Sequence, residues 1–178
     1  MSTARDLRNL ALIGFMGSGK STVGRLVADQ LRFELLDTDA LIEAQAGKTI
    51  TEIFRDNGEA VFRELERATV RDLAGRTNTV IATGGGLPVF FNNLDVLKTF
   101  ALVVCLWASP EAIYERVRHH THRPLLHDPD PLGKIQSLLA KREPFYRQAD
   151  VLINTEQRSV REVATQILHQ FHAARAGS

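Results

Sequence analysis

A glycine-rich segment near the N-terminus has the spacing of a phosphate-binding loop. The segment GFMGSGKS at 14–21 fits the pattern G-x-x-x-x-G-K-[S/T], follows the apolar run LALIG at 10–14 and precedes a stretch of helical period. Glycines allow consecutive backbone N–H groups to turn toward phosphate oxygens, and a helix that starts there adds its N-terminal dipole and unpaired donors. We therefore predict that residues 14–22 bind the phosphates of a nucleotide.

The side chains of this loop suggest separate roles. Lys20 supplies a positive charge toward the β- and γ-phosphates, the hydroxyl of Ser21 is the expected Mg²⁺ ligand, and Thr22 is expected to support the α- and β-phosphates. The loop alone leaves open a GTPase, an ATPase or a kinase, but the chain has no Asn-Lys-x-Asp motif for guanine. The other predicted ATP contacts in the loop are Gly17, Ser18 and Gly19.

Two carboxylates, Asp37 and Asp39, directly follow the apolar run FELL at 33–36. This position is the carboxyl edge of a parallel sheet, where ligands of α/β proteins bind. The run TVIA at 79–82 is followed by Thr83 and three glycines, without the aspartate that many P-loop proteins use for Mg²⁺. We therefore predict Asp37 as a metal-site residue just outside the direct ligands, and Asp39 as a residue that both caps its helix and binds substrate.

The elements that position these residues follow an alternating pattern. Short apolar runs alternate with longer stretches of helical period, which predicts parallel strands joined by crossover helices. Helix starts are indicated by Ser109-Pro110 and by two capping boxes, TITE at 49–52 and SVRE at 159–162. The predicted strands are 10–14, 33–36, 79–82, 101–107 and 151–154.

Two connections are longer than a crossover requires. Residues 38–78 are expected to hold a short helix, a second helix at about 49–57, a break at Asn57-Gly58 and a third helix with its apolar stripe at Val61, Leu65 and Ala68. Residues 119–130 read HHTHRPLLHDPD, too polar and proline-rich for a regular element, and are predicted to form a lid. Such insertions usually carry function.

Composition excludes several classes of protein. With 22 Lys and Arg against 21 Asp and Glu, the chain has no excess charge for a nucleic-acid-binding face. Residues 1–8 are polar, and no apolar stretch approaches the ~18 residues of a membrane span, so we expect a cytoplasmic protein without a membrane partner. Cys105 lies inside the apolar run ALVVCLW and is expected to be a buried small hydrophobe.

Taken together, these motifs resemble the shikimate kinase family. The likeness covers roughly residues 9–170 and is carried by GFMGSGKST, DTD, FR, GGG, RPLL and by KR before PFY. It implies an α/β, three-layer P-loop NTPase fold with a five-stranded parallel sheet, similar to the nucleoside-monophosphate kinases. It also implies ATP- and Mg²⁺-dependent phosphorylation of the shikimate 3-hydroxyl, a step of chorismate and aromatic amino-acid biosynthesis, by a monomer.

The resemblance also implies roles for residues at matching motif positions. Asp39 would contact the ring hydroxyls and orient or deprotonate the 3-hydroxyl, while Arg63 and Arg142 would clamp the carboxylate. Planar guanidinium groups suit this task because they grip a carboxylate bidentately. The triple glycine, Gly84, Gly85 and Gly86, would bind substrate through its backbone, with the N–H of Gly85 foremost.

The remaining implied roles concern ATP and the lid. Lid residue Arg123 would stabilise the charge on the transferred phosphoryl group together with Lys20, so that the predicted catalytic residues are Lys20, Asp39 and Arg123. Arg116 and Arg158 would flank the adenine. We expect one domain over residues 1–178, with a core of about 9–37, 76–118 and 131–171, a substrate-binding insertion at about 38–75 and the lid at about 119–130.

Some alternatives remain open from the sequence alone. A kinase of another small hydroxy acid such as gluconate would share the loop, and a noncatalytic nucleotide-binding regulator would need neither Lys20 nor Asp39. Arg63 has Glu59 and Glu66 at helical spacing, so without its FR context it would be expected to form solvated ion pairs. Arg142 would similarly suit an ordinary charged helix end.

Overall fold

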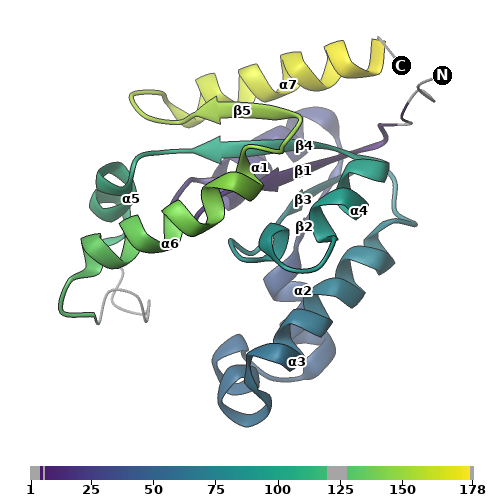
Figure 1. The fold of residues 1–178 in the computed structure, drawn as a ribbon. Coiled ribbons are helices and arrows are strands. Elements are labelled where there is room, and N and C mark those ends of the chain that lie inside the picture. The colour runs from purple at the N-terminus through teal and green to yellow at the C-terminus, as the bar shows by residue number, and fades with distance from the viewer. Residues whose placement is uncertain (1–4, 6, 120–127, 177–178) are drawn as a thin grey trace.

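A five-stranded parallel sheet forms the centre of the molecule (Figure 1). The structure is a computed structural model, and it describes Arg5, residues 7–119 and residues 128–176. The strand order is β2-β3-β1-β4-β5, so the strand that carries the glycine-rich loop lies in the middle. The strands are β1 (Asn9–Ile13), β2 (Glu34–Asp37), β3 (Thr79–Ala82), β4 (Ala101–Trp107) and β5 (Val151–Asn154). The predicted α/β fold with a five-stranded parallel sheet is confirmed.

Helices cover both faces of the sheet, so strands are apolar on both sides. On one face, α1 (Lys20–Leu31) and α7 (Val160–Ala176) pack over the alternate residues Leu10 and Leu12 of β1. On the other face, Ala11 and Ile13 contact a second cluster. Helices contributing to that cluster are α3 (Ile50–Leu73), α4 (Asn93–Phe100), α5 (Pro110–Val117) and α6 (Pro131–Tyr146), and a short 3₁₀ helix, η1 (Leu87–Val89), lies between β3 and α4.

Local sequence signals define the ends of these elements. The three strands predicted at 79–82, 101–107 and 151–154 have those bounds, and the first two strands differ from the prediction by one residue at each end. The hydroxyl of Ser109 accepts a hydrogen bond from the N–H of Ala112 at the start of α5. Both predicted capping boxes are formed, at the starts of α3 and α7. Cys105 is fully buried, and burial raises the pKa of its thiol to about 12.

The predicted insertion forms α2 (Thr38–Ala46) and α3, which extend away from the sheet (Figure 1). The expected break is present, because Gly58 has φ 83° and ψ 171° and separates α3 into two helical parts. In the predicted apolar stripe of the second part, Val61 is wrong because it is 43% exposed, whereas Leu65 packs against the buried Phe62 cluster. The buried face of this part contains the polar residues Glu66 and Thr69, so the spacing of apolar residues alone does not identify it. Its members are Phe62, Glu66, Thr69, Val70 and Leu73.

Two further expectations concern the lid and the absence of a membrane span. Most of the predicted lid, including Arg123, lies in residues 120–127, outside the described residues. Within the described ranges, no helix is both long enough and apolar enough to cross a bilayer.

Candidate active site

The glycine-rich loop connects the carboxyl end of β1 to α1 and leaves the start of that helix open to a ligand. Gly19 is the N-cap with φ 97°, a left-handed conformation that glycine adopts without a Cβ clash. It provides no side-chain hydrogen bond to the helix, and the first turn of α1 has no acidic residue. The unpaired N–H groups and the positive end of the helix dipole therefore remain available for phosphate. Nζ of Lys20 lies over the loop, 2.8 Å from the carbonyl oxygen of Gly14.

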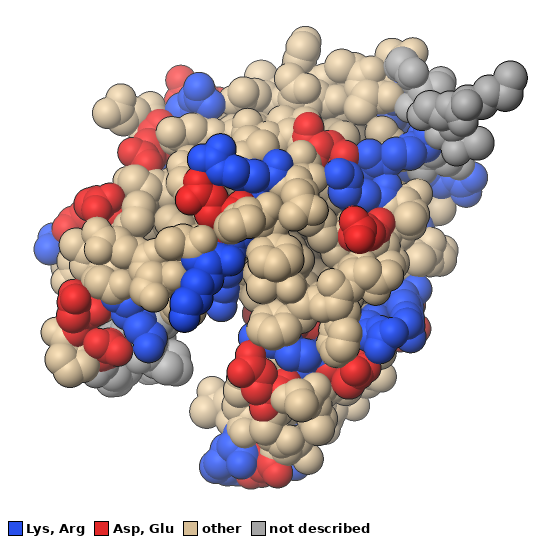
Figure 2. All heavy atoms as spheres, viewed as in Figure 1, with Lys and Arg blue, Asp and Glu red and all other residues tan. Residues whose placement is uncertain are grey.

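A cavity of about 420 Å³ lies beside this loop at the carboxyl edge of the sheet. Figure 2 shows that the surface is hollowed between the α2–α3 insertion and α6. Residues far apart in the sequence meet at the cavity because parallel strands end at one edge. The predicted site residues that line it are Gly17, Gly19, Lys20, Ser21, Thr22, Asp37, Asp39, Gly84, Gly85 and Arg116, whereas the loop residue Ser18 is buried and does not line it.

The structure shows which of the two carboxylates, Asp37 or Asp39, caps α2. Oδ1 of Asp37 accepts hydrogen bonds from the N–H groups of Asp39 (2.9 Å) and Ala40 (3.2 Å), so Asp37 is the cap of α2. The expectation that Asp39 caps its own helix is therefore wrong. Asp39 lies inside the first turn, and no donor among the described residues reaches its buried Oδ1. Burial and the neighbouring Asp37 raise the pKa of Asp39 to about 6, against the lowering effect of Lys20.

The triple glycine at 84–86 lies against three predicted substrate residues from three different helices. A Cβ atom added at Gly84 would lie 2.6 Å from Oδ1 of Asp39, and one added at Gly86 would lie 2.8 Å from Nη1 of Arg63. At Gly85 the nearest atom would be Nη1 of Arg142, at 3.2 Å. Each glycine thus lets one polar side chain approach the backbone. The structure therefore brings Asp39, Arg63 and Arg142 together over three consecutive residues.

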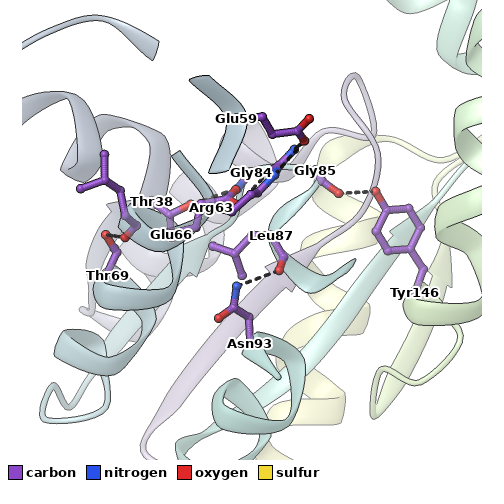
Figure 3. Close-up of polar contacts among 11 residues, drawn as sticks. Thr38, Glu59, Arg63, Glu66, Thr69, Gly84, Gly85, Leu87, Asn93 and Tyr146 are labelled. Carbon is purple, nitrogen blue, oxygen red and sulfur yellow. Dashed lines mark hydrogen bonds and ion pairs between the residues drawn. The ribbon is translucent and has the colours of Figure 1, made fainter. Parts of the chain in front are cut away.

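Hydrogen bonds hold this glycine segment in place (Figure 3). The N–H of Gly84 donates to Oγ1 of Thr38 at 3.0 Å, so this N–H is bonded within the protein. The hydroxyl of Tyr146, from the last turn of α6, donates to the carbonyl oxygen of Gly85 at 2.6 Å. Four residues earlier on the same helix, the guanidinium of Arg142 lies 5.3 Å from the ring centre of Phe15. The glycine-rich loop, the triple glycine and α6 are therefore linked.

Arg63 is held on both edges of its guanidinium group (Figure 3). Its Nη1 donates to Oε2 of Glu66 at 2.8 Å, and its Nε and Nη2 donate to Oε1 of Glu59 at 3.1 and 2.8 Å. The side chain of Arg63 is only 12% exposed and that of Glu66 only 1%, so the pair of Arg63 with Glu66 is not a solvated surface pair. Burial raises the pKa of Glu66 to about 6 despite the opposing effect of Arg63.

The two arginines predicted to flank adenine occupy different surroundings. Arg116, from α5, donates to Oγ1 of Thr155 at 2.9 Å and to its carbonyl oxygen at 3.0 Å, and it lines the cavity beside Gly17. Arg158 donates to the carbonyl oxygen of Asn154 and to Oε1 of Gln166, and it does not line this cavity. The geometry thus brings Arg116, but not Arg158, to the glycine-rich loop.

Comparison with known proteins identifies the family to which this site belongs. A family model described as shikimate kinase matches residues 16–172, most of the chain. The chain belongs to the shikimate kinase family. It is 42% identical over 165 residues to the shikimate kinase of Caldanaerobacter subterraneus subsp. tengcongensis, and the alignment covers 93% of this chain and 96% of that protein. The resemblance predicted from the motifs is confirmed.

Solved structures agree with the assignment to the shikimate kinase family. A shikimate kinase from Acinetobacter baumannii, in complex with shikimate, has a TM-score of 0.87 and 39% identity, with 94% of each chain covered. A gluconokinase from Sinorhizobium meliloti 1021 has a TM-score of 0.65 with 97% of this chain and 96% of that chain covered. It is only 19% identical, so this second likeness extends to the fold alone.

Ser21 and Asp37 provide oxygen atoms suited to the magnesium ion that accompanies ATP. Both residues line the cavity beside the loop, and the cap of α2 uses only one oxygen of the Asp37 carboxylate. Mg²⁺ binds few protein oxygens and fills its remaining positions with phosphate and water. A hydroxyl and a carboxylate oxygen at the edge of a phosphate-binding cavity therefore fit this ion.

Two contacts of the shikimate kinase site go beyond what the sequence patterns predict. Glu66 forms the ion pair with Arg63 that its helical spacing predicts, but the pair is buried on α3 rather than solvated. Tyr146 belongs to the PFY motif, but only the structure shows that its hydroxyl contacts a loop 61 residues away in the sequence.

Replacing Tyr146 with phenylalanine is expected to lower stability by about 1–2 kcal/mol, because the carbonyl oxygen of Gly85 would lose its donor. Tyr146 is fully buried, so water cannot simply replace the hydroxyl. Urea unfolding measures the change. The matched control is Tyr114→Phe, at the only other tyrosine in the chain. Equal unfolding midpoints for the two variants would contradict the structural role given to the Tyr146 hydroxyl.

Proposed function

We propose that this member of the shikimate kinase family transfers the γ-phosphoryl group of ATP to the 3-hydroxyl of shikimate, giving shikimate 3-phosphate and ADP. One observation carries the proposal: Asp39, Arg63 and Arg142 lie over consecutive glycines beside a nucleotide phosphate loop. Two guanidinium groups and one carboxylate form a set complementary to a ring with a carboxylate and hydroxyl groups. The reaction belongs to chorismate and aromatic amino-acid biosynthesis.

The acceptor is oriented from two sides in this proposal. Arg63 and Arg142 bind the carboxylate of shikimate through charge-assisted hydrogen bonds, which fixes the ring relative to the loop. Asp39 lines the cavity, and its carboxylate accepts a hydrogen bond from the ring hydroxyl. Its pKa of about 6 keeps it ionised at neutral pH yet basic enough to receive a proton as the hydroxyl attacks.

The donor is positioned by the loop. N–H groups at the start of α1 bind the phosphates, and Lys20 provides positive charge as negative charge develops on the transferred group. Ser21 would bind Mg²⁺ directly, with Asp37 just outside the direct ligands, and the ion would neutralise phosphate charge and help to align the γ-phosphate. We propose the same stabilising role for Arg123, which lies outside the described residues, and a contact of Arg116 with the nucleotide.

A coupled ADP-release assay tests the proposal. The purified protein, with ATP and Mg²⁺, is offered shikimate, quinate, gluconate and nucleosides in separate reactions. We expect ADP release that depends on shikimate, because a ring that bears a carboxylate and hydroxyl groups complements both arginines and Asp39. Turnover of gluconate without turnover of shikimate would overturn the assignment in favour of a related kinase, and no turnover of any acceptor would favour a nucleotide-binding regulator.

Several other expectations remain predictions. They are a monomeric state, a cytoplasmic location, the absence of nucleic-acid and membrane partners, the roles of Arg158 and the lid, and the proposed boundaries of the insertion at 38–75 and lid at 119–130.

A further inference from the structure

The segment that follows the triple glycine has a well-defined shape. Leu87 and Pro88 are buried, and the N–H of Leu87 donates to the carbonyl oxygen of Gly84 at 3.2 Å. Nδ2 of the buried Asn93 donates back to the carbonyl oxygen of Leu87 at 3.1 Å (Figure 3). These contacts tie residues 87–93 to the glycine segment at one end and to the start of α4 at the other. Phe90 and Phe91, two of the five residues between Leu87 and Asn93, therefore project from a fixed turn.

These two aromatic residues contact two arginines of α3. Cζ of Arg63 lies 3.9 Å from the ring centre of Phe90, and Cζ of Arg67 lies 4.9 Å from the ring centre of Phe91. The arginines are four residues apart, so they lie one above the other on the helix. Phe91 adopts φ 54°, a left-handed conformation that is rare for a bulky residue and is found where surrounding contacts impose it.

The contact with Phe90 completes the enclosure of Arg63. Glu59 and Glu66 hold the edges of the guanidinium group, and Phe62 lies at a longer distance of 5.2 Å from its Cζ. Hydrogen bonds along the edges restrain the group within its plane, but an aromatic ring stacked on its face restrains the tilt of that plane. A carboxylate ligand is bound bidentately only when it shares the plane of the guanidinium.

We infer that Phe90 is a positioning residue for substrate binding, which fixes the plane of the Arg63 guanidinium for the carboxylate of the acceptor. The inference rests on the proposed function, because it requires Arg63 to bind that carboxylate. Phe90 acts through Arg63, whose guanidinium group its ring contacts. The turn that carries Phe90 is hydrogen-bonded to the triple glycine, which lies against Asp39 and Arg142. The same segment therefore positions Arg63 as well as contacting the other two substrate residues.

The experiment measures steady-state kinetics for Phe90→Leu, which keeps an apolar side chain but removes the ring. We expect the KM for shikimate to rise roughly 3- to 20-fold, the range of an aromatic contact with a partly buried cation, while kcat and the KM for ATP stay unchanged. Phe90→Trp keeps a ring and should restore the KM. Phe91→Leu is the matched control, since this neighbour contacts Arg67 instead, and its KM for shikimate should stay within about twofold of the original.

A double-mutant cycle separates positioning from simple packing. The background variant carries Arg63→Ala together with Glu66→Gln, so that no buried carboxylate is left without its partner. In this background, Phe90→Leu should cause no further rise in the KM for shikimate. A rise of equal size in both backgrounds, or an unchanged KM for Phe90→Leu alone, would overturn the inference. If Arg63→Ala itself leaves the KM for shikimate unchanged, the proposed carboxylate site fails instead, so the two failures are distinguishable.

Discussion

Replacing Asp39 with asparagine is expected to reduce kcat by about 10²- to 10⁴-fold, the usual contribution of a positioned acid–base group. Asparagine has nearly the same shape and still fits against Gly84, but it cannot accept the proton of the attacking hydroxyl. The KM for ATP should change little, because the loop and Lys20 are intact. Steady-state ADP release measures both constants. A kcat within about threefold of the original would show that Asp39 is not the base and leave it at most a positioning group.

The same substitution is expected to make the unliganded protein more stable above pH 6. The pKa of Asp39 in the folded protein is about 6, above its ordinary value of 3.8, so the folded state binds this proton more tightly than the unfolded state does. The ionised carboxylate therefore costs stability, by up to about 3 kcal/mol for a shift of this size. This cost is fully present above pH 6, declines as the pH falls through 6 and is absent below about 4.

Thermal unfolding from pH 3.5 to 8 checks this second effect. The Asp39→Asn variant should have a higher Tm than the original protein at pH 8 and an equal one at pH 3.5. Asp37→Asn is the comparison variant: asparagine also caps helices and should leave the start of α2 in place, and because it removes only the repulsion from Asp37, its Tm at pH 8 should rise less than that of Asp39→Asn. A lower Tm for Asp39→Asn at pH 8 would contradict the unfavourable environment that we assign to this carboxylate.

Features of the fold that depend on neighbours in sequence could be predicted. Each strand is a short apolar run with a helical stretch after it, and the predicted caps at Thr49, Ser109 and Ser159 are formed because capping depends on residues within one turn. The break at Gly58 is equally local. The stripe at Val61 was misplaced because the buried face of α3 contains the ion-paired Glu66, which has no apolar signal.

Features that depend on tertiary contacts could not be predicted from the same patterns. Two aspartates separated by one residue suit a cap equally well, and only the path of the chain between β2 and α2 makes Asp37 the cap and leaves Asp39 facing Gly84. The triple glycine was expected to let a ligand approach the backbone. In the structure each glycine accommodates a polar side chain of the site, and nothing in three consecutive glycines specifies which partner approaches. Phe90 likewise meets Arg63 only after folding.

Replacing Arg63 with alanine is expected to raise the KM for shikimate by roughly 10²-fold, as two charge-assisted hydrogen bonds to the carboxylate are lost. The KM for ATP should be unchanged, since Arg63 does not line the cavity beside the nucleotide loop. Arg67→Ala is the matched control: it removes the arginine of the next turn, which pairs with the exposed Glu64 at 3.7 Å, and should leave both constants within about twofold. An unchanged KM for shikimate in Arg63→Ala would show that the acceptor site lies elsewhere.

Arg63→Ala should also destabilise the protein, and this effect can be separated from the loss of binding. Glu66 is 1% exposed, so removing its partner leaves a buried carboxylate unpaired, a change that typically costs about 3–5 kcal/mol. Without Arg63 the pKa of Glu66 rises further above 6, so the loss of stability is greatest at high pH and diminishes as the pH falls and the carboxyl takes up a proton. Adding Glu66→Gln should therefore restore much of the stability without restoring the KM for shikimate. If stability and KM recovered together, the apparent binding defect would be a consequence of unfolding, and Arg63 would have only a structural role.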